Sequence, residues 1–118
     1  MGNPVVHFEV MGKDPIALQK FYKEAFDWEM GDPMPEARNY AMAQPKGKVG
    51  IDGGIGSAMD GDAGRVTFYV AVPNLEAALS KIQGLGGKTI MPPDNVGEST
   101  RIAQFADPEG HVIGLVQS

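Results

Sequence analysis

Apolar and polar residues alternate along two stretches of the chain, residues 5–10 and residues 65–72. Because successive side chains of a strand point to opposite faces of a sheet, this period of two predicts a β-strand at each stretch. The apolar faces, predicted to lie in the core, carry Val6, Phe8 and Val10 in the first strand and Val66, Phe68, Val70 and Val72 in the second. The opposite faces carry His7 and Glu9, and Thr67 and Tyr69.

Each strand is followed by a capping residue and an apolar stripe with helical spacing. Asp14 and Asn74 can accept hydrogen bonds from free backbone N–H groups at a helix N-terminus, and Pro15 suits the first helical position. The stripes recur at intervals of three and four, which predicts amphipathic helices. They consist of Leu18, Phe21, Tyr22 and Ala25 in the first helix and Leu75, Ala78, Leu79 and Ile82 in the second.

Shorter strands are predicted after each helix. They cover residues 26–30, 40–43 and 49–55 in the first half, and residues 88–91, 100–106 and 111–117 in the second. Gly84–Gly87 is expected to end the second helix, Pro92–Pro93 to end the strand over 88–91, and Asp107–Gly110 to form a hairpin turn. The glycines at positions 50, 53 and 54 suggest a bulge or a close approach to the backbone.

The order strand, helix, three strands therefore occurs twice. It predicts an α+β fold with two tandem βαβββ modules, about residues 1–60 and about residues 61–118, joined near residues 57–64 in one domain over residues 1–118. Such modules favour a curled mixed sheet with both helices on its outer face. The inner face is then a cup, and the function is expected there.

Composition narrows the class of protein. The 118 residues carry 10 basic and 15 acidic side chains, a net charge of −5, without basic clusters, so neither nucleic acid nor an anionic membrane is an expected partner. Cysteine is absent, which rules out thiolate chemistry and disulfides. Without a recognisable signal or membrane-spanning run, a soluble, cytoplasmic protein is expected.

Three segments carry a resemblance to a known family: "FYKEAFDWEM", "VTFYVAVPNLEAALSKIQGLGGKTIMPP" and "RIAQFADPEGHVIGLVQ". Together with the order of elements, they resemble the vicinal oxygen chelate superfamily, which includes glyoxalase I, extradiol dioxygenases and bleomycin-binding proteins. The resemblance covers essentially the whole chain and is closest to small glyoxalase-like proteins. It implies a homodimer and a small-molecule ligand in the cup, but its motifs mark structure rather than chemistry.

The resemblance also implies where a divalent metal, such as Ni, Zn, Mn or Fe, would bind. One family ligand position falls on His7, and Glu9 lies on the same strand face. The matching positions in the second module are Thr67 and Gly114, which are unsuited to hold a metal, and near residues 51–55 only Asp52 could coordinate. At best half of the usual metal ligands are present.

Other residues are candidates for ligand binding or catalysis. His7 and Glu9 could form an acid–base pair beside a carbonyl, or simply line the cup. Thr67, Tyr69 and Arg101 are candidate ligand-binding residues. Tyr69 and Arg101 could orient an anionic or carbonyl ligand, although Arg101 could also be solvated. Tyr40 and Trp28 could stack on a planar ligand, with core packing favoured for Trp28.

Three functions are compatible with these observations. The first is a small-molecule-binding protein with a degraded metal site, which best fits Thr67 and Gly114. The second is a lyase or dioxygenase-type enzyme that uses a divalent metal or an acid–base pair at His7 and Glu9. The third is a protein that sequesters an antibiotic without chemistry.

Overall fold

The structure is a computed structural model and describes residues 2–59 and 63–118. The chain divides into two compact units. The first unit is His7–Val66, and the second unit is Thr67–Ser118 together with the N-terminal residues up to Val6. Each unit is described by itself. Residues 60–62 of the expected connection between modules lie outside the described residues.

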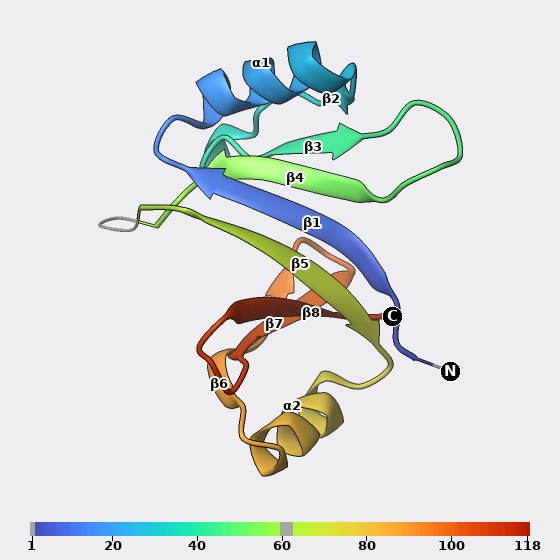
Figure 1. Cartoon of the computed structure of the whole chain (residues 1–118), viewed down its shortest axis with the longest axis vertical. Coiled ribbons are helices and arrows are strands. Elements are labelled where there is room, and N and C mark those ends of the chain that lie inside the picture. Colours follow the sequence, from blue (N-terminus) through green and yellow to red (C-terminus); the bar gives the residue numbers. More distant parts are fainter. Residues whose placement is uncertain (1, 60–62) are drawn as a thin grey trace. The chain divides into compact units, whose positions relative to one another are not determined.

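The first unit is a four-stranded mixed sheet with one α-helix. In chain order its elements are most of β1 (Val5–Gly12), α1 (Pro15–Phe26), β2 (Glu29–Met30), the 3₁₀-helix η1 (Pro35–Ala37), β3 (Ala41–Gln44) and β4 (Asp52–Ser57). The strand order is β2-β3-β4-β1, in which β4 runs parallel to β1 and the other pairs are antiparallel. Figure 1 shows α1, in blue, lying alongside β2, β3 and β4.

The second unit repeats this arrangement. It contains most of β5 (Arg65–Val72), α2 (Leu75–Gly84), β6 (Lys88–Val96), β7 (Thr100–Ala106) and β8 (Val112–Gln117). The strand order is β5-β8-β7-β6, in which β8 is parallel to β5 and the remaining pairs are antiparallel. The helix α2 contacts β6, β7 and β8 (Figure 1).

Both helices begin at the capping residues expected from the sequence. The Asp14 carboxylate accepts a hydrogen bond from the Ala17 backbone N–H at 3.1 Å, and the Asn74 side chain accepts one from Ala77 at 2.9 Å. After α2, Gly86 adopts a φ of 99°, a left-handed conformation that costs glycine little. The predicted helix starts and the predicted stop of α2 are confirmed.

The core of the second unit is built from one face of its sheet and the stripe on α2. Val72, Leu75, Leu79, Ala103 and Leu115 are buried there, with Ile82 packed at their edge. Burying one large aliphatic side chain contributes roughly 1.5–3 kcal/mol. The prediction that the whole apolar face of β5 lies in the core is wrong at its start, because Val66 and Phe68 are 77% and 41% exposed.

The core of the first unit differs from the predicted stripe. Of the stripe residues Phe21, at 60%, and Ala25 are exposed, and the polar Gln19 is buried instead. An aromatic cluster links α1 to the sheet: Trp28 stacks on Tyr22 with ring centroids 5.6 Å apart and also packs against Phe8 and Phe26. Trp28 therefore has the packing role favoured from the sequence.

The strand β6 runs through Pro92 and Pro93 instead of ending there, so that predicted stop is wrong. A proline cannot donate a hydrogen bond, but it is tolerated in an edge strand and at bulges. β6 is the edge strand of the second unit, and its pairing with β7 shifts register between Thr89 and Asp94. The α+β class and the twofold βαβββ order are nevertheless confirmed.

Candidate functional site

The polar face of the first unit gathers the chemically active side chains. His7 and Glu9 lie two residues apart on β1, so both point to one face. In the parallel pairing with β4, His7 is opposite Asp52 and Glu9 is opposite Gly54. Residues opposite each other in a sheet share a face, which adds Asp52 and Gly54 to the site.

Tyr40 joins His7 to Glu9. Its hydroxyl lies 2.8 Å from His7 Nε2 and donates to Glu9 Oε2 at 3.1 Å. Since that hydroxyl donates its one proton to the carboxylate, it accepts from His7, and the network assigns the imidazole proton to Nε2. The three side chains form one hydrogen-bonded chain, called the His7–Tyr40–Glu9 cluster below.

Two glycines of β4 make room for Tyr40. A Cβ at Gly54 would overlap the Tyr40 hydroxyl and ring, and a Cβ at Gly56 would lie 2.8 Å from Tyr40 Cδ2. Gly53 points to the other face, where a Cβ would overlap the ring of Phe8. Of the three glycines predicted to mark a close approach, Gly54 lies under Tyr40 and Gly53 under Phe8, whereas a Cβ at Gly50 would meet its nearest atoms only at 3.5 Å.

Gln19 holds the segment that carries Tyr40. From its buried position on α1, Nε2 donates to the Asn39 carbonyl at 2.7 Å and to the Ile55 carbonyl at 2.9 Å. Asn39 directly precedes Tyr40 and has a φ of 60°, an uncommon left-handed conformation for a residue other than glycine. Gln19 is thus a positioning residue, tying Tyr40 to β4.

The His7 imidazole is held toward its neutral form. Partial burial lowers its pKa below the ordinary value of 6.5, and the Asp52 carboxylate, which favours the imidazolium, offsets part of that effect. A neutral imidazole can both donate and accept a proton. Partial burial therefore favours the form of His7 that can do either.

Acidification should weaken the fold through His7. The unfolded chain takes up a proton near pH 6.5, whereas folded His7 does so only at lower pH, so the free energy of unfolding should fall as pH drops below about 6.5. Urea unfolding between about pH 8 and about pH 5 measures this. His7→Gln should flatten the upper part of that curve; identical curves for His7→Gln and the natural chain would contradict the assignment.

The matching face of the second unit carries Tyr69, Gln104 and Thr67. The Tyr69 ring, 5% exposed, lies over Gly114, where a Cβ would overlap it. Gln104 Nε2 donates to the Tyr69 hydroxyl at 3.3 Å, and the buried Thr67 hydroxyl donates to the Val112 carbonyl at 3.4 Å. On this face the tyrosine hydroxyl bonds to an amide, whereas in the first unit it bonds to an imidazole and a carboxylate.

Arg101 lies among structural contacts. Its guanidinium donates to Glu76 at 2.9 Å and to Gln117 Oε1 at 3.2 Å, the same oxygen that accepts from the Leu75 N–H at the start of α2. The side-chain hydrogen bond between Arg101 and Glu76 lowers the pKa of that carboxyl. These contacts tie β7 and β8 to α2, and ligand binding by Arg101 stays a prediction.

The side chains at the family's ligand positions do not fit a metal-chelating set. His7 Nε2 and Glu9 already bond to Tyr40, the Thr67 hydroxyl is directed to a backbone carbonyl, and the space beside Gly114 holds a tyrosine ring. Across residues 2–59 and 63–118, no three His, Cys, Asp or Glu side chains are grouped to hold a metal ion. The chemistry considered below therefore uses side chains alone.

The sequence indicated some of this site. It placed His7 and Glu9 on one face and named Tyr40, but it assigned Tyr40 to ligand stacking. The sequence interpretation missed Gln19. A glutamine at a core-facing helix position would have indicated this residue, because its buried amide requires hydrogen-bond partners. The interpretation also took Gly114 as a missing ligand, without the tyrosine ring that occupies the space.

Comparison of the sequence with known proteins identifies a family and several relatives. Residues 5–115 match the family described as Glyoxalase/Bleomycin resistance protein/Dioxygenase superfamily. Proteins named "Putative glyoxylase CFP32", from Mycobacterium bovis and Mycobacterium tuberculosis, are 31% identical over 109 residues, which is 89% of this chain and 42% of theirs. The chain thus spans less than half the length of these curated relatives.

Solved structures share the fold. A methylmalonyl-CoA epimerase from Streptomyces coelicolor aligns with a TM-score of 0.71 at 16% identity, over 98% of this chain and 94% of that one. A hypothetical protein from Bacillus halodurans aligns with a TM-score of 0.75 at 10% identity, over 100% and 96%. At these identities the likeness concerns the fold alone.

Neither helix of the described residues has the length and apolarity needed to cross a bilayer. The homodimer and the cytoplasmic location expected from the sequence stay predictions.

Proposed function

Because the chain belongs to the glyoxalase/bleomycin resistance protein/dioxygenase superfamily, we propose that its His7–Tyr40–Glu9 cluster binds a small molecule through a carbonyl or hydroxyl oxygen, without a metal. This proposal rests on the Tyr40 hydroxyl, which forms hydrogen bonds with an imidazole and a carboxylate. The glycines of β4 leave the space that the Tyr40 side chain occupies. A partly buried polar network of this kind is costly to build and is often functional.

The chemistry of the cluster defines the class of ligand. A bound ligand would exchange with the hydrogen bonds inside the cluster, where the imidazole N–H can donate, the carboxylate can accept and the tyrosine hydroxyl can do both. A ligand with neighbouring carbonyl and hydroxyl oxygens, such as a 2-hydroxy or 2-oxo carbonyl compound, presents the complementary acceptor and donor. Met42 lies opposite Gly54 in the β3–β4 pairing and offers an adaptable apolar surface beside these groups.

Tyr40→Phe should weaken ligand binding about tenfold or more. The substitution keeps the ring over Gly54 and removes only the hydroxyl, and a hydrogen bond to a charged group contributes roughly 1.5–3 kcal/mol. Binding is measured by NMR line broadening and shift changes with a panel of 2-oxo acids, 2-hydroxy acids and the hemithioacetal of methylglyoxal and glutathione. The natural chain is screened first, and the variant is titrated with each compound that binds.

The matched control is Tyr22→Phe. It makes the same chemical change in the aromatic cluster between α1 and the sheet and should leave every affinity unchanged. Binding that survives Tyr40→Phe, or that disappears when the protein is treated with a chelator, would contradict the proposal. If no compound of the panel shifts His7, Tyr40 or Glu9 resonances, the assigned ligand class is wrong.

A second function at the same cluster is proton transfer. The depressed pKa of His7 and the carboxylate of Glu9, linked through one hydroxyl, are arranged to move a proton to and from a carbon beside a carbonyl. Exchange of that carbon's hydrogen for deuterium in D₂O, followed by NMR on each bound compound, detects the step. Exchange by the natural chain that is lost in both His7→Gln and Glu9→Gln, each measured at a concentration of the compound that saturates the variant, would establish an enzyme; binding without exchange leaves a binding protein.

A further inference from the structure

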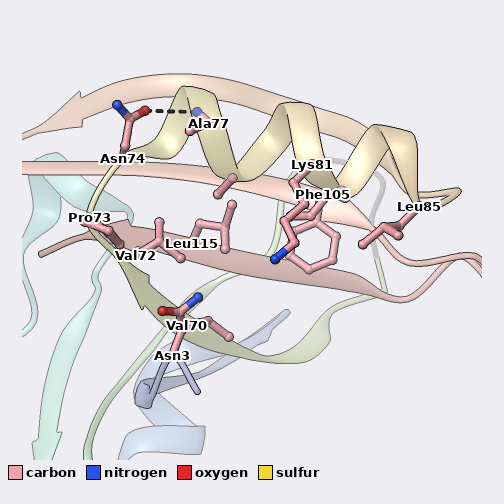
Figure 2. A pocket seen from close by; sticks show the side chains of 12 residues that line it. Asn3, Val70, Val72, Pro73, Asn74, Ala77, Lys81, Leu85, Phe105 and Leu115 are labelled. Carbon is pink, nitrogen blue, oxygen red and sulfur yellow. Dashed lines mark hydrogen bonds between the residues drawn. The ribbon is translucent and has the colours of Figure 1, made fainter. Parts of the chain in front are cut away.

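The second unit contains a pocket of about 450 Å³ between α2 and its sheet. It lies on the face of β5 that carries Val70 and Val72, opposite the face of Thr67 and Tyr69. Apolar side chains form most of its wall, and in Figure 2 the labelled Val70, Val72 and Leu115 lie below α2. The proposed function above makes no use of this pocket.

The pocket has a buried floor and an open rim. Val72 and Leu115 at its floor are 4% and 2% exposed, whereas Leu85 at the end of α2 is 71% exposed. The helix presents the short side chains of Ala77 and Ala78 to this space. Small-molecule sites measure roughly 300–1,000 Å³, so this open groove has the volume of such a site.

Charge complementarity identifies the polar end of the ligand. Among the described residues that line the pocket, Lys81 is the one that carries a charge, in a chain whose net charge is −5. In Figure 2 its side chain extends from α2 toward the sheet beside Phe105, and Asn3 lies on the sheet side. Within the described residues no ion pair engages the Lys81 ammonium, and the Asn74 oxygen is already bonded to Ala77.

We propose that this pocket binds a medium-chain aliphatic carboxylate. Its chain lies along the aliphatic floor, and its carboxylate pairs with the Lys81 ammonium at the edge of α2. The walls favour an aliphatic over a planar aromatic ligand, because Phe105 is the single aromatic residue in the lining. The concave, ligand-sized shape argues for a small molecule rather than a protein partner, since stable protein interfaces bury about 1,200 Å² or more.

Isothermal titration of the full chain with decanoate tests the inference. Decanoate should bind in a saturable manner below its micelle concentration and about fifteenfold more tightly than octanoate, since each of its two additional buried CH₂ groups contributes about a fourfold gain. Lys81→Met should weaken decanoate about tenfold and leave 1-decanol unchanged. Lys23→Met, a lysine of α1 outside the pocket, is the matched control and should change neither.

A second variant separates filling of the pocket from loss of the fold. Ala78→Leu places an apolar side chain in the space and should abolish decanoate binding while the melting temperature holds or rises. Weak, non-saturable heats, equal decanoate affinity in Ala78→Leu, or equal affinity in Lys81→Met would each overturn the inference. So would a natural dimer that Ala78→Leu converts to monomer, because the occupant would then be a second copy of the chain.

Discussion

Gly54→Ala is expected to eject Tyr40 from the His7–Tyr40–Glu9 cluster and to abolish the proposed ligand binding. The new Cβ would overlap the Tyr40 hydroxyl and ring, and Tyr40 is held from the other side by Gln19 through the Asn39 carbonyl. Overpacking of this kind typically costs about 1–3 kcal/mol. The free energy of unfolding in urea and the NMR signals of the His7 ring measure both effects.

A matched glycine in the same unit serves as the control. A Cβ at Gly31 would meet its nearest atoms at 3.6 Å, an ordinary contact distance, so Gly31→Ala should leave stability and His7 unchanged. The double variant Gly54→Ala/Tyr40→Ala should recover much of the lost stability without recovering ligand binding. If Gly54→Ala keeps natural stability and the natural His7 spectrum, Tyr40 does not lie over β4 as described.

Gly114→Glu is expected to destabilise the second unit rather than to create a metal site. The family resemblance placed a ligand carboxylate at this position, but a Cβ there would overlap the ring of Tyr69, which is 5% exposed. Displacing a buried aromatic ring or straining around it should cost about 1–3 kcal/mol or more. Thermal unfolding with and without added Ni or Zn measures stability and metal binding together.

The decisive comparison removes the ring. Gly114→Glu/Tyr69→Ala has space for the carboxylate and should be more stable than the sum of the two single variants, because the overlap is gone. Gly84→Glu introduces the same charge where a Cβ meets nothing within 4 Å and serves as the control. A rise in melting temperature with metal in the single Gly114→Glu variant would show that Tyr69 yields and that the metal site is recoverable.

Both units therefore place a tyrosine over a strand glycine, but the groups around the tyrosine hydroxyl differ. In each, a tyrosine ring lies over a strand glycine and occupies space where another side chain could stand. Around the Tyr40 hydroxyl are an imidazole and a carboxylate, whereas the Tyr69 hydroxyl accepts from an amide. This difference is the reason to look for proton transfer in the first unit.

The local elements were decided by the sequence itself. Local features of the sequence act within a few residues, and these match the structure: the alternation at residues 65–72, the helix caps Asp14 and Asn74, and the glycine after α2. The same patterns predicted the α+β class and the twofold βαβββ order. The patterns did not predict burial correctly at Val66 and Phe68, which are exposed. Alternation identifies the two faces of a strand, but it does not show which part of a face a helix covers.

The site itself was decided by tertiary structure. Tyr40 meets His7 and Glu9 across 33 and 31 residues of chain, and Gln19 reaches Ile55 across 36. The periodicity of the sequence does not predict contacts between residues so far apart in the chain, because these contacts depend on the parallel pairing of β1 with β4 and on the turn before β3. The sequence determined which side chains share the polar face of β1; packing of Tyr40 over Gly54 decided that they form one hydrogen-bonded chain.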